Sequence, residues 1–282
     1  MEHIVEGSRM LDSVSFIGGG VMAEAMIQGL LTRNLLSCKT ITVAEPREER
    51  RKELEKKHGI IATADNLQAA KSCRILVLSV KPQDLNHVLA SLSGQLQLGQ
   101  MVMSIVAGAR TGTISSGLRH DAIVRVMPNT PAQIGEGMSV WTSTPRVSKE
   151  QREQARIILR ALGTELYVNE EKFLDMATAV SGTGPTYVFL VMEAMIDAAV
   201  HLGFPRHIAY QLVTETMKGS IMYAIKSEKH PAELRNLVTS PGGTSAAALY
   251  ELEKGSLRTV LSKAIWVAYE RSRSLGEKET PN

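Results

Sequence analysis

Cysteine, aromatic residues and surplus charge are all scarce in this sequence of 282 residues, and each shortage excludes a class of protein. The two cysteines, Cys38 and Cys73, cannot cross-link a chain of this length, and neither stands in a zinc-binding spacing. We therefore expect the protein to reside in a reducing compartment and to have no metal site. Aromatic residues make up 4%, too few for the stacking platforms of single-stranded nucleic-acid binders. The net charge of +3 creates no field that would attract nucleic acid or a membrane surface.

Long uncharged apolar runs are also missing. Residues 1–12 lack the apolar centre of a signal peptide, and the most apolar later stretch, residues 186–202, is interrupted by Glu193, Asp197 and His201. The sequence therefore predicts a cytoplasmic protein without a membrane segment, with a flexible leader over residues 1–12.

The rest of the chain divides into two halves with different patterns. Over residues 13–169, short apolar runs alternate with longer amphipathic ones. The pattern predicts strands over residues 14–17, 40–44, 75–80, 101–107, 123–127 and 138–142, and helices over 22–34, 48–58 and 149–162. Strands that are apolar on both faces and alternate with helices indicate an α/β domain with a parallel sheet covered on both sides.

Residues 170–282 read as successive helices separated by glycine and proline stops. The stretch over residues 187–202 is apolar nearly all round, so its helix needs neighbours on several sides. Because a helical half of this size cannot supply them all, we expect a second subunit to do so, in a homodimer or a higher homo-oligomer.

A glycine turn follows the first expected strand. Gly18-Gly19-Gly20-Val21-Met22-Ala23 has the G-x-G-x-x-A form of the dinucleotide fingerprint, and it lies between a strand and a helix as that fingerprint requires. The first glycine permits the tight turn, and the second lets the backbone approach a pyrophosphate at the helix N-terminus. The first half is therefore predicted to be a Rossmann domain that binds NAD or NADP.

The end of the second expected strand leaves the choice of cofactor open. An acidic residue there usually receives the ribose hydroxyls of NAD, whereas a nearby arginine can hold the 2′-phosphate of NADP. This sequence carries both, as Glu45-Pro46-Arg47. Downstream, Lys81 follows another expected strand, where it could face the cofactor phosphates or cap the sheet.

Four further strings carry a family resemblance. They are Val80-Lys81-Pro82, Met127-Pro128-Asn129-Thr130-Pro131, Ser181-Gly182-Thr183-Gly184-Pro185 and Ser240-Pro241-Gly242-Gly243-Thr244-Ser245. In this order they resemble pyrroline-5-carboxylate reductase over residues 14–275. The resemblance implies reduction of 1-pyrroline-5-carboxylate to L-proline with NADPH or NADH, the last step of proline biosynthesis. It also implies a Rossmann domain over residues 13–169, a helical dimerisation and substrate domain over residues 170–282, and a substrate site between them.

The resemblance also places residues in the two sites. Cofactor contacts are implied for Gly18, Gly19, Gly20, Val21, Met22, Glu45, Pro46, Arg47, Asn66, Ser79, Val80, Lys81, Pro82 and Ala107. Substrate contacts are implied for Gly242, Gly243, Thr244, Ser245 and Glu171, with Thr244 and Ser245 as the catalytic hydroxyl residues. Two positions depart from the family pattern: Leu237 replaces an asparagine that touches the cofactor in some relatives, and Glu45 replaces a small hydroxyl residue.

The chemistry of the Ser-Pro-Gly-Gly loop agrees with that expectation. Pyrroline-5-carboxylate is a cyclic imine with one carboxylate, and Gly242 and Gly243 precede an expected helix over residues 245–253, whose N–H groups can bind an anion. An imine that enters protonated needs no strong acid from the protein.

Two alternatives remain. One is a 3-hydroxyacid dehydrogenase-like enzyme, which would carry a catalytic lysine at the position of Val188. The other is a non-catalytic nucleotide-binding paralogue of the reductase, which would need no anion-binding loop in the helical half.

Overall fold

The structure is a computed structural model that describes residues 11–277. It contains two compact units: Gly184–Val267 forms one, and the other contains residues 11–183 together with 268–277. The division therefore falls later than the expected boundary at residues 169 and 170, and the end of the last helix returns to the first unit. The expected leader lies largely outside the described residues, but Leu11, which it included, is buried in the core.

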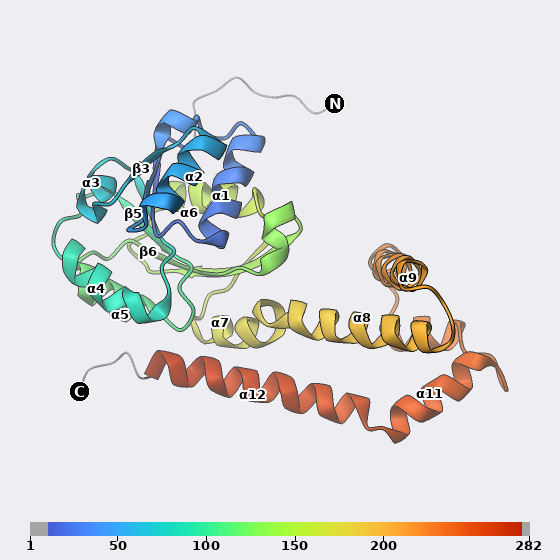
Figure 1. Ribbon diagram of the computed structural model, residues 1–282. Coiled ribbons are helices and arrows are strands. Elements are labelled where there is room, and N and C mark those ends of the chain that lie inside the picture. Colours follow the sequence, from blue (N-terminus) through green and yellow to red (C-terminus); the bar gives the residue numbers. More distant parts are fainter. Residues whose placement is uncertain (1–10, 278–282) are drawn as a thin grey trace. The chain divides into compact units, whose positions relative to one another are not determined.

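The first unit is built on an eight-stranded sheet (Figure 1). Its strands are β1 (Val14–Ile17), β2 (Ile41–Ala44), β3 (Ile61–Thr63), β4 (Ile75–Leu78), β5 (Met101–Ser104), β6 (Ile123–Met127), β7 (Gly137–Ser143) and β8 (Gly163–Tyr167). The spatial order is β3-β2-β1-β4-β5-β6-β7-β8. All neighbours are parallel except β6 and β7, which pair antiparallel. The chain order reverses between β1 and β4, and at such a switch point open α/β sheets bind ligands beyond the carboxyl ends of their strands.

Helices cover both faces of this sheet, as its strand pattern predicts. They are α1 (Val21–Thr32), α2 (Glu48–His58), α3 (Asn66–Lys71), α4 (Pro82–Leu92), α5 (Thr111–Leu118), α6 (Lys149–Arg160) and α7 (Lys172–Ala177), with 3-10 turns at Cys38–Thr40 and Thr130–Ile134. Alternate strand residues face opposite sides: Phe16 packs with α1, α2 and α6, whereas Ile17 packs with α3, α4 and α5. The two-sided α/β architecture is thus confirmed.

Several elements differ from the expected ones for local reasons. The strands expected over residues 75–80 and 101–107 end at Leu78 and Ser104, and the residues after them form loops at the sheet edge. Strand β3 has only three residues, and α5 is rich in glycine, serine and threonine, so neither element has a strong local pattern.

The second unit is entirely helical. A π-helical turn at Thr178–Gly182 precedes α8 (Gly184–His201), which is followed by α9 (Arg206–Ser227), α10 (Pro231–Leu237), α11 (Thr244–Lys254) and the first part of α12 (Leu257–Glu277). The buried core of this unit is small and centres on Ile196, Ala209 and Val213. In α8, Ile196 alone is buried. The apolar helix expected over residues 187–202 therefore exposes most of its surface within one chain.

Candidate functional site

The glycine turn after β1 is shaped for a ligand with an anionic group. Gly18 has a φ of +100°, and a Cβ there would lie 2.9 Å from the carbonyl oxygen of Ser79, so only glycine fits. A Cβ at Gly20 would instead lie in open space, with no protein atom within 4 Å. Gly20 is the N-cap of α1 and makes no side-chain cap, so the first N–H groups of the helix remain open to an anion.

Three hydrogen bonds from side chains hold this turn in place. The Gly19 N–H donates to Glu45 Oε2 at 3.1 Å, and the Gly19 carbonyl accepts from Arg50 Nε at 2.8 Å. The Ser79 hydroxyl donates to the Gly18 carbonyl at 2.8 Å. The turn is therefore pre-organised by residues from β2, α2 and the end of β4, so little conformational entropy is lost when a ligand binds.

A cleft of about 790 Å³ adjoins the turn. Most of the residues expected to bind the cofactor line it: Gly18, Gly20, Glu45, Pro46, Arg47, Asn66, Ser79, Val80 and Lys81. Five others do not line it: Gly19, Val21, Met22, Pro82 and Ala107. Gly19 lies behind the turn, where a Cβ would come 2.8 Å from Leu54 Cδ1. Pro82 begins α4, and Ala107 lies in the loop after β5.

The cleft also has lining residues that the sequence analysis missed. They include Ala64 beside α3, and Gln83, Asp84, His87 and Val88 on α4. A helix starting at Pro82 would have placed Asp84, His87 and Val88 on one face by their spacing. Lys81, whose role the sequence left open, lines the cleft and has no ion-pair partner among residues 11–277.

Glu45 is the charged group most firmly fixed in the cleft wall. It is 5% exposed, and its carboxylate accepts hydrogen bonds from the Gly19 N–H, the Arg47 N–H and Arg47 Nε. Burial by itself raises the pKa of Glu45, but the hydrogen bonds from Arg47 and Gly19 outweigh it and lower the pKa below the ordinary value of 4.5. The group is therefore ionised at neutral pH.

The Ser-Pro-Gly-Gly loop of the helical unit forms a second candidate anion site. Gly242 has a φ of +69°, a left-handed conformation that favours glycine. Gly243 is the N-cap of α11, and its N–H donates to the Ser240 carbonyl at 3.1 Å. No side chain caps this helix, so the first N–H groups of α11 are open beside the exposed hydroxyl residues Thr244 and Ser245. One carboxylate fits such an N-terminus.

Glu171, an expected substrate contact, already has partners in the first unit. Its two carboxylate oxygens accept from the Thr111 N–H and the Thr111 hydroxyl, both at 2.8 Å, at the start of α5. Arg125 Nη1 donates to it at 2.9 Å and also binds Asp175. Arg125 is 3% exposed, and the sequence analysis missed it although it is the charged residue of an otherwise apolar strand.

The Met-Pro-Asn-Thr-Pro string has a structural explanation. Asn129 Nδ2 donates to the carbonyl of Ser181 at 3.2 Å, and Asn129 Oδ1 accepts from the Met138 N–H at 2.8 Å. One side chain thus joins the start of β7 to the Ser-Gly-Thr-Gly-Pro string. Two of the four motifs of the resemblance are therefore connected in the fold.

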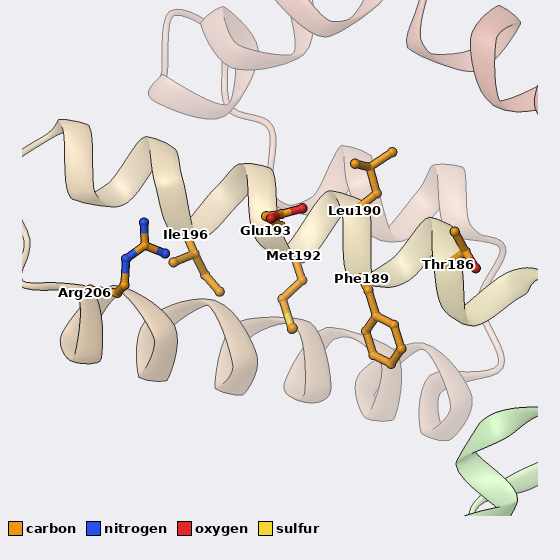
Figure 2. A pocket seen from close by; sticks show the side chains of 7 residues that line it. All are labelled: Thr186, Phe189, Leu190, Met192, Glu193, Ile196 and Arg206. Atoms are coloured by element: carbon orange, nitrogen blue, oxygen red, sulfur yellow. The ribbon is translucent and has the colours of Figure 1, made fainter. Parts of the chain in front are cut away.

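The helical unit also has an open groove of about 550 Å³ along α8 (Figure 2). It is lined by Thr186, Phe189, Leu190, Met192, Glu193, Ile196 and Arg206. Phe189 and Met192 point toward α9, and most of the lining side chains are apolar. Across residues 11–277, no cluster of His, Cys, Asp or Glu could hold a metal ion.

Comparisons with known proteins identify the family of this chain. Residues 171–275 match the family model for pyrroline-5-carboxylate reductase dimerisation, and residues 13–108 match that for NADP oxidoreductase, coenzyme F420-dependent. A pyrroline-5-carboxylate reductase from Synechocystis is 41% identical over 94% of this chain and 98% of its own length. The chain belongs to the pyrroline-5-carboxylate reductase family. A family member from Arabidopsis thaliana is 34% identical over 94% of this chain and 95% of its own length.

Solved structures of the family share the fold. The enzyme from Coxiella burnetii has a TM-score of 0.85 at 34% identity, covering 94% of this chain and 98% of its own. The enzyme from Plasmodium falciparum, solved with NADP bound, has a TM-score of 0.87 at 31% identity, covering 94% of this chain and 99% of its own. Together with the match over residues 13–108, this supports the use of NAD(P)H.

Family membership also bears on the most apolar part of the chain. Sequence analysis expected no membrane segment, but α7, the π-helical turn and α8 join into a helical run, Lys172–His201, that is long and apolar enough to cross a membrane by length and composition alone. The dimerisation match includes this run, and helices at subunit interfaces carry the same apolar surface. The match supports a homo-oligomer.

Proposed function

We propose that the chain reduces 1-pyrroline-5-carboxylate to L-proline with a hydride from NAD(P)H, in the cytoplasm, as the last step of proline biosynthesis. The observation that carries the proposal is the presence of two pre-shaped anion sites in one chain of this family. One is the glycine turn at the start of α1, and the other is the uncapped start of α11. The first suits a pyrophosphate and the second suits a single carboxylate.

The residues around the large cleft fit a dinucleotide. The open side of Gly20 and the free N–H groups of α1 would hold the pyrophosphate, Lys81 would add a positive charge, and Glu45 would accept from the adenosine ribose. When bound, NAD(P)H supplies the hydride. The chain's residues hold and orient it.

The loop before α11 binds the substrate in this proposal. The free N–H groups in the first turn of α11, which begins at Thr244, receive the carboxylate, and Gly242 gives the loop its left-handed turn. The hydroxyls of Thr244 and Ser245 hydrogen-bond the ring nitrogen or the carboxylate. The hydride adds to the carbon of the C=N bond, whose electron pair passes to the nitrogen. Because that nitrogen is already protonated, no strong acid is required from the protein.

Glu171 has a positioning role in this proposal rather than direct contact with the substrate. Both of its oxygens are engaged by Thr111 and Arg125, and it satisfies the free N–H at the start of α5. It therefore keeps α5 and α7 in register. As in the sequence analysis, we assign dinucleotide binding to the first part of the chain, and substrate binding and dimer formation to the helical part.

The test is cofactor oxidation by the purified chain with pyrroline-5-carboxylate as acceptor. We expect oxidation of NADH or NADPH that requires the acceptor, with one L-proline formed per cofactor oxidised, and no oxidation with 3-oxoacids as acceptors. Gly20→Val serves as a control, because its side chain would fill the open side of the turn and abolish cofactor binding.

The competing function is a non-catalytic nucleotide-binding paralogue. It predicts that the chain binds NAD(P)H, as measured by nicotinamide fluorescence, but oxidises none in the presence of the acceptor. That result would replace the reductase proposal.

A further inference from the structure

Glu45 stands at the carboxyl end of β2, on the side of the glycine turn away from β4. Glu45 is 5% exposed, and its carboxylate is held from two directions, by the Gly19 N–H at 3.1 Å and by Arg47 Nε at 2.9 Å. Moving it out of the cleft wall would leave the buried Gly19 N–H without a partner, which is costly. The acceptor group is therefore a fixed feature of the cleft.

The hydrogen bonds of Glu45 leave room for one kind of ligand group. An ionised carboxylate has about four acceptor positions and no donor. Oε1 accepts from the N–H and Nε of Arg47, whereas Oε2 accepts from Gly19 alone among the described contacts. A second position on Oε2 is therefore available to a donor. A ribose hydroxyl donates a hydrogen bond, but a phosphate ester at neutral pH is an acceptor and carries a charge of about −1.5 to −2.

The neighbouring arginines do not offset the preference of Glu45 for a hydrogen-bond donor over a phosphate. Arg50 donates to the Gly19 carbonyl and pairs with Glu24, and Arg51 Nη1 donates to the carbonyls of Glu45 and Pro46, both at 2.8 Å. Arg47 has an exposed side chain, but its Nε is bound to Glu45. A 2′-phosphate that drew the Arg47 side chain away would remove the guanidinium from the buried Glu45 carboxylate and place a second negative charge beside it. Lys81 follows β4, on the other side of β1.

We propose that Glu45 makes this chain prefer NADH over NADPH, by accepting a hydrogen bond from the adenosine ribose and repelling a 2′-phosphate. The inference rests on the proposed function for its physiological meaning, but it concerns cofactor binding and can be measured without turnover. The sequence, which carries both Glu45 and Arg47, leaves the choice between NADH and NADPH open, and this inference makes that choice from the geometry around Glu45.

The experiment compares the chain with Glu45→Gln and Glu45→Ser. Glutamine keeps the shape and an acceptor for the Gly19 N–H, whereas serine removes the whole group. The matched control is Glu48→Gln, which removes the same charge from an exposed residue of α2 that pairs with Lys52 and does not line the cleft. For each protein, kcat and KM are measured with NADH and with NADPH, and Kd is measured by nicotinamide fluorescence. Circular dichroism confirms folding.

We expect the unchanged chain to favour NADH by about tenfold or more in both Kd and kcat/KM. Both Glu45 variants should lower that ratio by about tenfold, through Kd and KM for NADPH rather than through kcat. Glu48→Gln should leave the ratio within about twofold, since exposed charges are screened.

Tighter or equal binding of NADPH by the unchanged chain would overturn the proposal, and so would a ratio unaffected by Glu45→Gln and Glu45→Ser. A chain that binds NADH more tightly with the expected dependence on Glu45, but reduces no pyrroline-5-carboxylate, would refute the proposed function and leave this inference standing.

Discussion

At the scale of single residues, the loop before α11 depends on the absence of side chains. A Cβ at Gly243, the N-cap of α11, would lie 2.6 Å from Ser240 Oγ and 3.2 Å from the Ser240 carbonyl oxygen. Gly243 has a φ of −81°, so its backbone conformation does not itself require glycine. Glycine there is explained by the close approach of Ser240 and leaves the helix N-terminus accessible to a ligand.

Replacing Gly243 by valine should therefore block the substrate carboxylate without disturbing the glycine turn of the other unit. Losing one or two charge-assisted hydrogen bonds costs about 2–5 kcal/mol, or about 30- to several-thousand-fold in kcat/KM. Ser245→Ala removes one neutral hydrogen bond and should cost only about 1 kcal/mol. Steady-state kinetics and NADPH titration of both variants measure these effects. Near-normal kcat/KM in Gly243→Val, or an equal loss of cofactor affinity, would show that the anion site is elsewhere.

At the scale of elements, one carboxylate ties α1 to α2. Glu24, in the first turn of α1, binds Arg50 at 2.5 Å, Lys57 at 2.6 Å and His58 at 3.1 Å. Partial burial by itself raises the pKa of Glu24, but the hydrogen bonds from Lys57, Arg50 and His58 outweigh it and lower the pKa from 4.5 to about 2. Since Arg50 also binds the Gly19 carbonyl, this cluster supports the glycine turn.

The lowered pKa of Glu24 makes a prediction about acid stability. The folded state holds this group ionised more strongly than the unfolded chain does, so its contribution is fully present above about pH 4.5 and is lost as the pH falls through about 2. Glu24→Gln should lower the free energy of unfolding at pH 7 by about 1–2 kcal/mol after solvent screening, and should flatten its dependence on pH between those values.

Denaturant unfolding at a series of pH values checks this prediction, with Glu48→Gln as the control. Glu48 forms an exposed i,i+4 pair with Lys52, which contributes about 0.3–0.5 kcal/mol. Equal losses in the two variants at pH 7 would contradict the role assigned to the Glu24 cluster.

At the scale of the whole molecule, the helical unit lacks a core large enough to hold it together alone. Its buried apolar residues are few, while Phe189, Leu190 and Ile221 are 56%, 64% and 62% exposed in the single chain. Exposed apolar surface of this extent marks a protein interface. This fits the dimerisation match over residues 171–275.

We therefore expect an obligate homodimer, or an assembly of dimers, that forms through the helical unit. Phe189→Glu should disrupt assembly and lower activity by more than about tenfold, because symmetry places the introduced charge at the interface twice. Leu98→Glu is the control, because Leu98 is 98% exposed in the first unit. Light scattering at micromolar concentration checks both variants. A folded and active monomer of the unchanged chain would refute the prediction.

Local signals were enough to predict much of this fold. Strand β1, strand β6 and helix α2 have the bounds that their apolar or charged patterns predict, because each pattern is complete within a few residues. The glycine turn and the helix after Ser-Pro-Gly-Gly were also predictable, since glycine and helix N-termini have local conformational requirements.

Only the tertiary structure decided what depends on residues far apart in the chain. Three such features are the antiparallel β6–β7 pair, the contact of Glu171 with Thr111 and the hydrogen bond between Glu45 and Gly19. Each joins two segments, and neither segment has a sequence pattern that identifies its partner. The sequence placed Glu45 and Arg47 side by side with opposite implications for the cofactor. The fold buries the carboxylate and leaves the guanidinium exposed, because β2 ends inside the cleft wall while the chain turns outward toward α2.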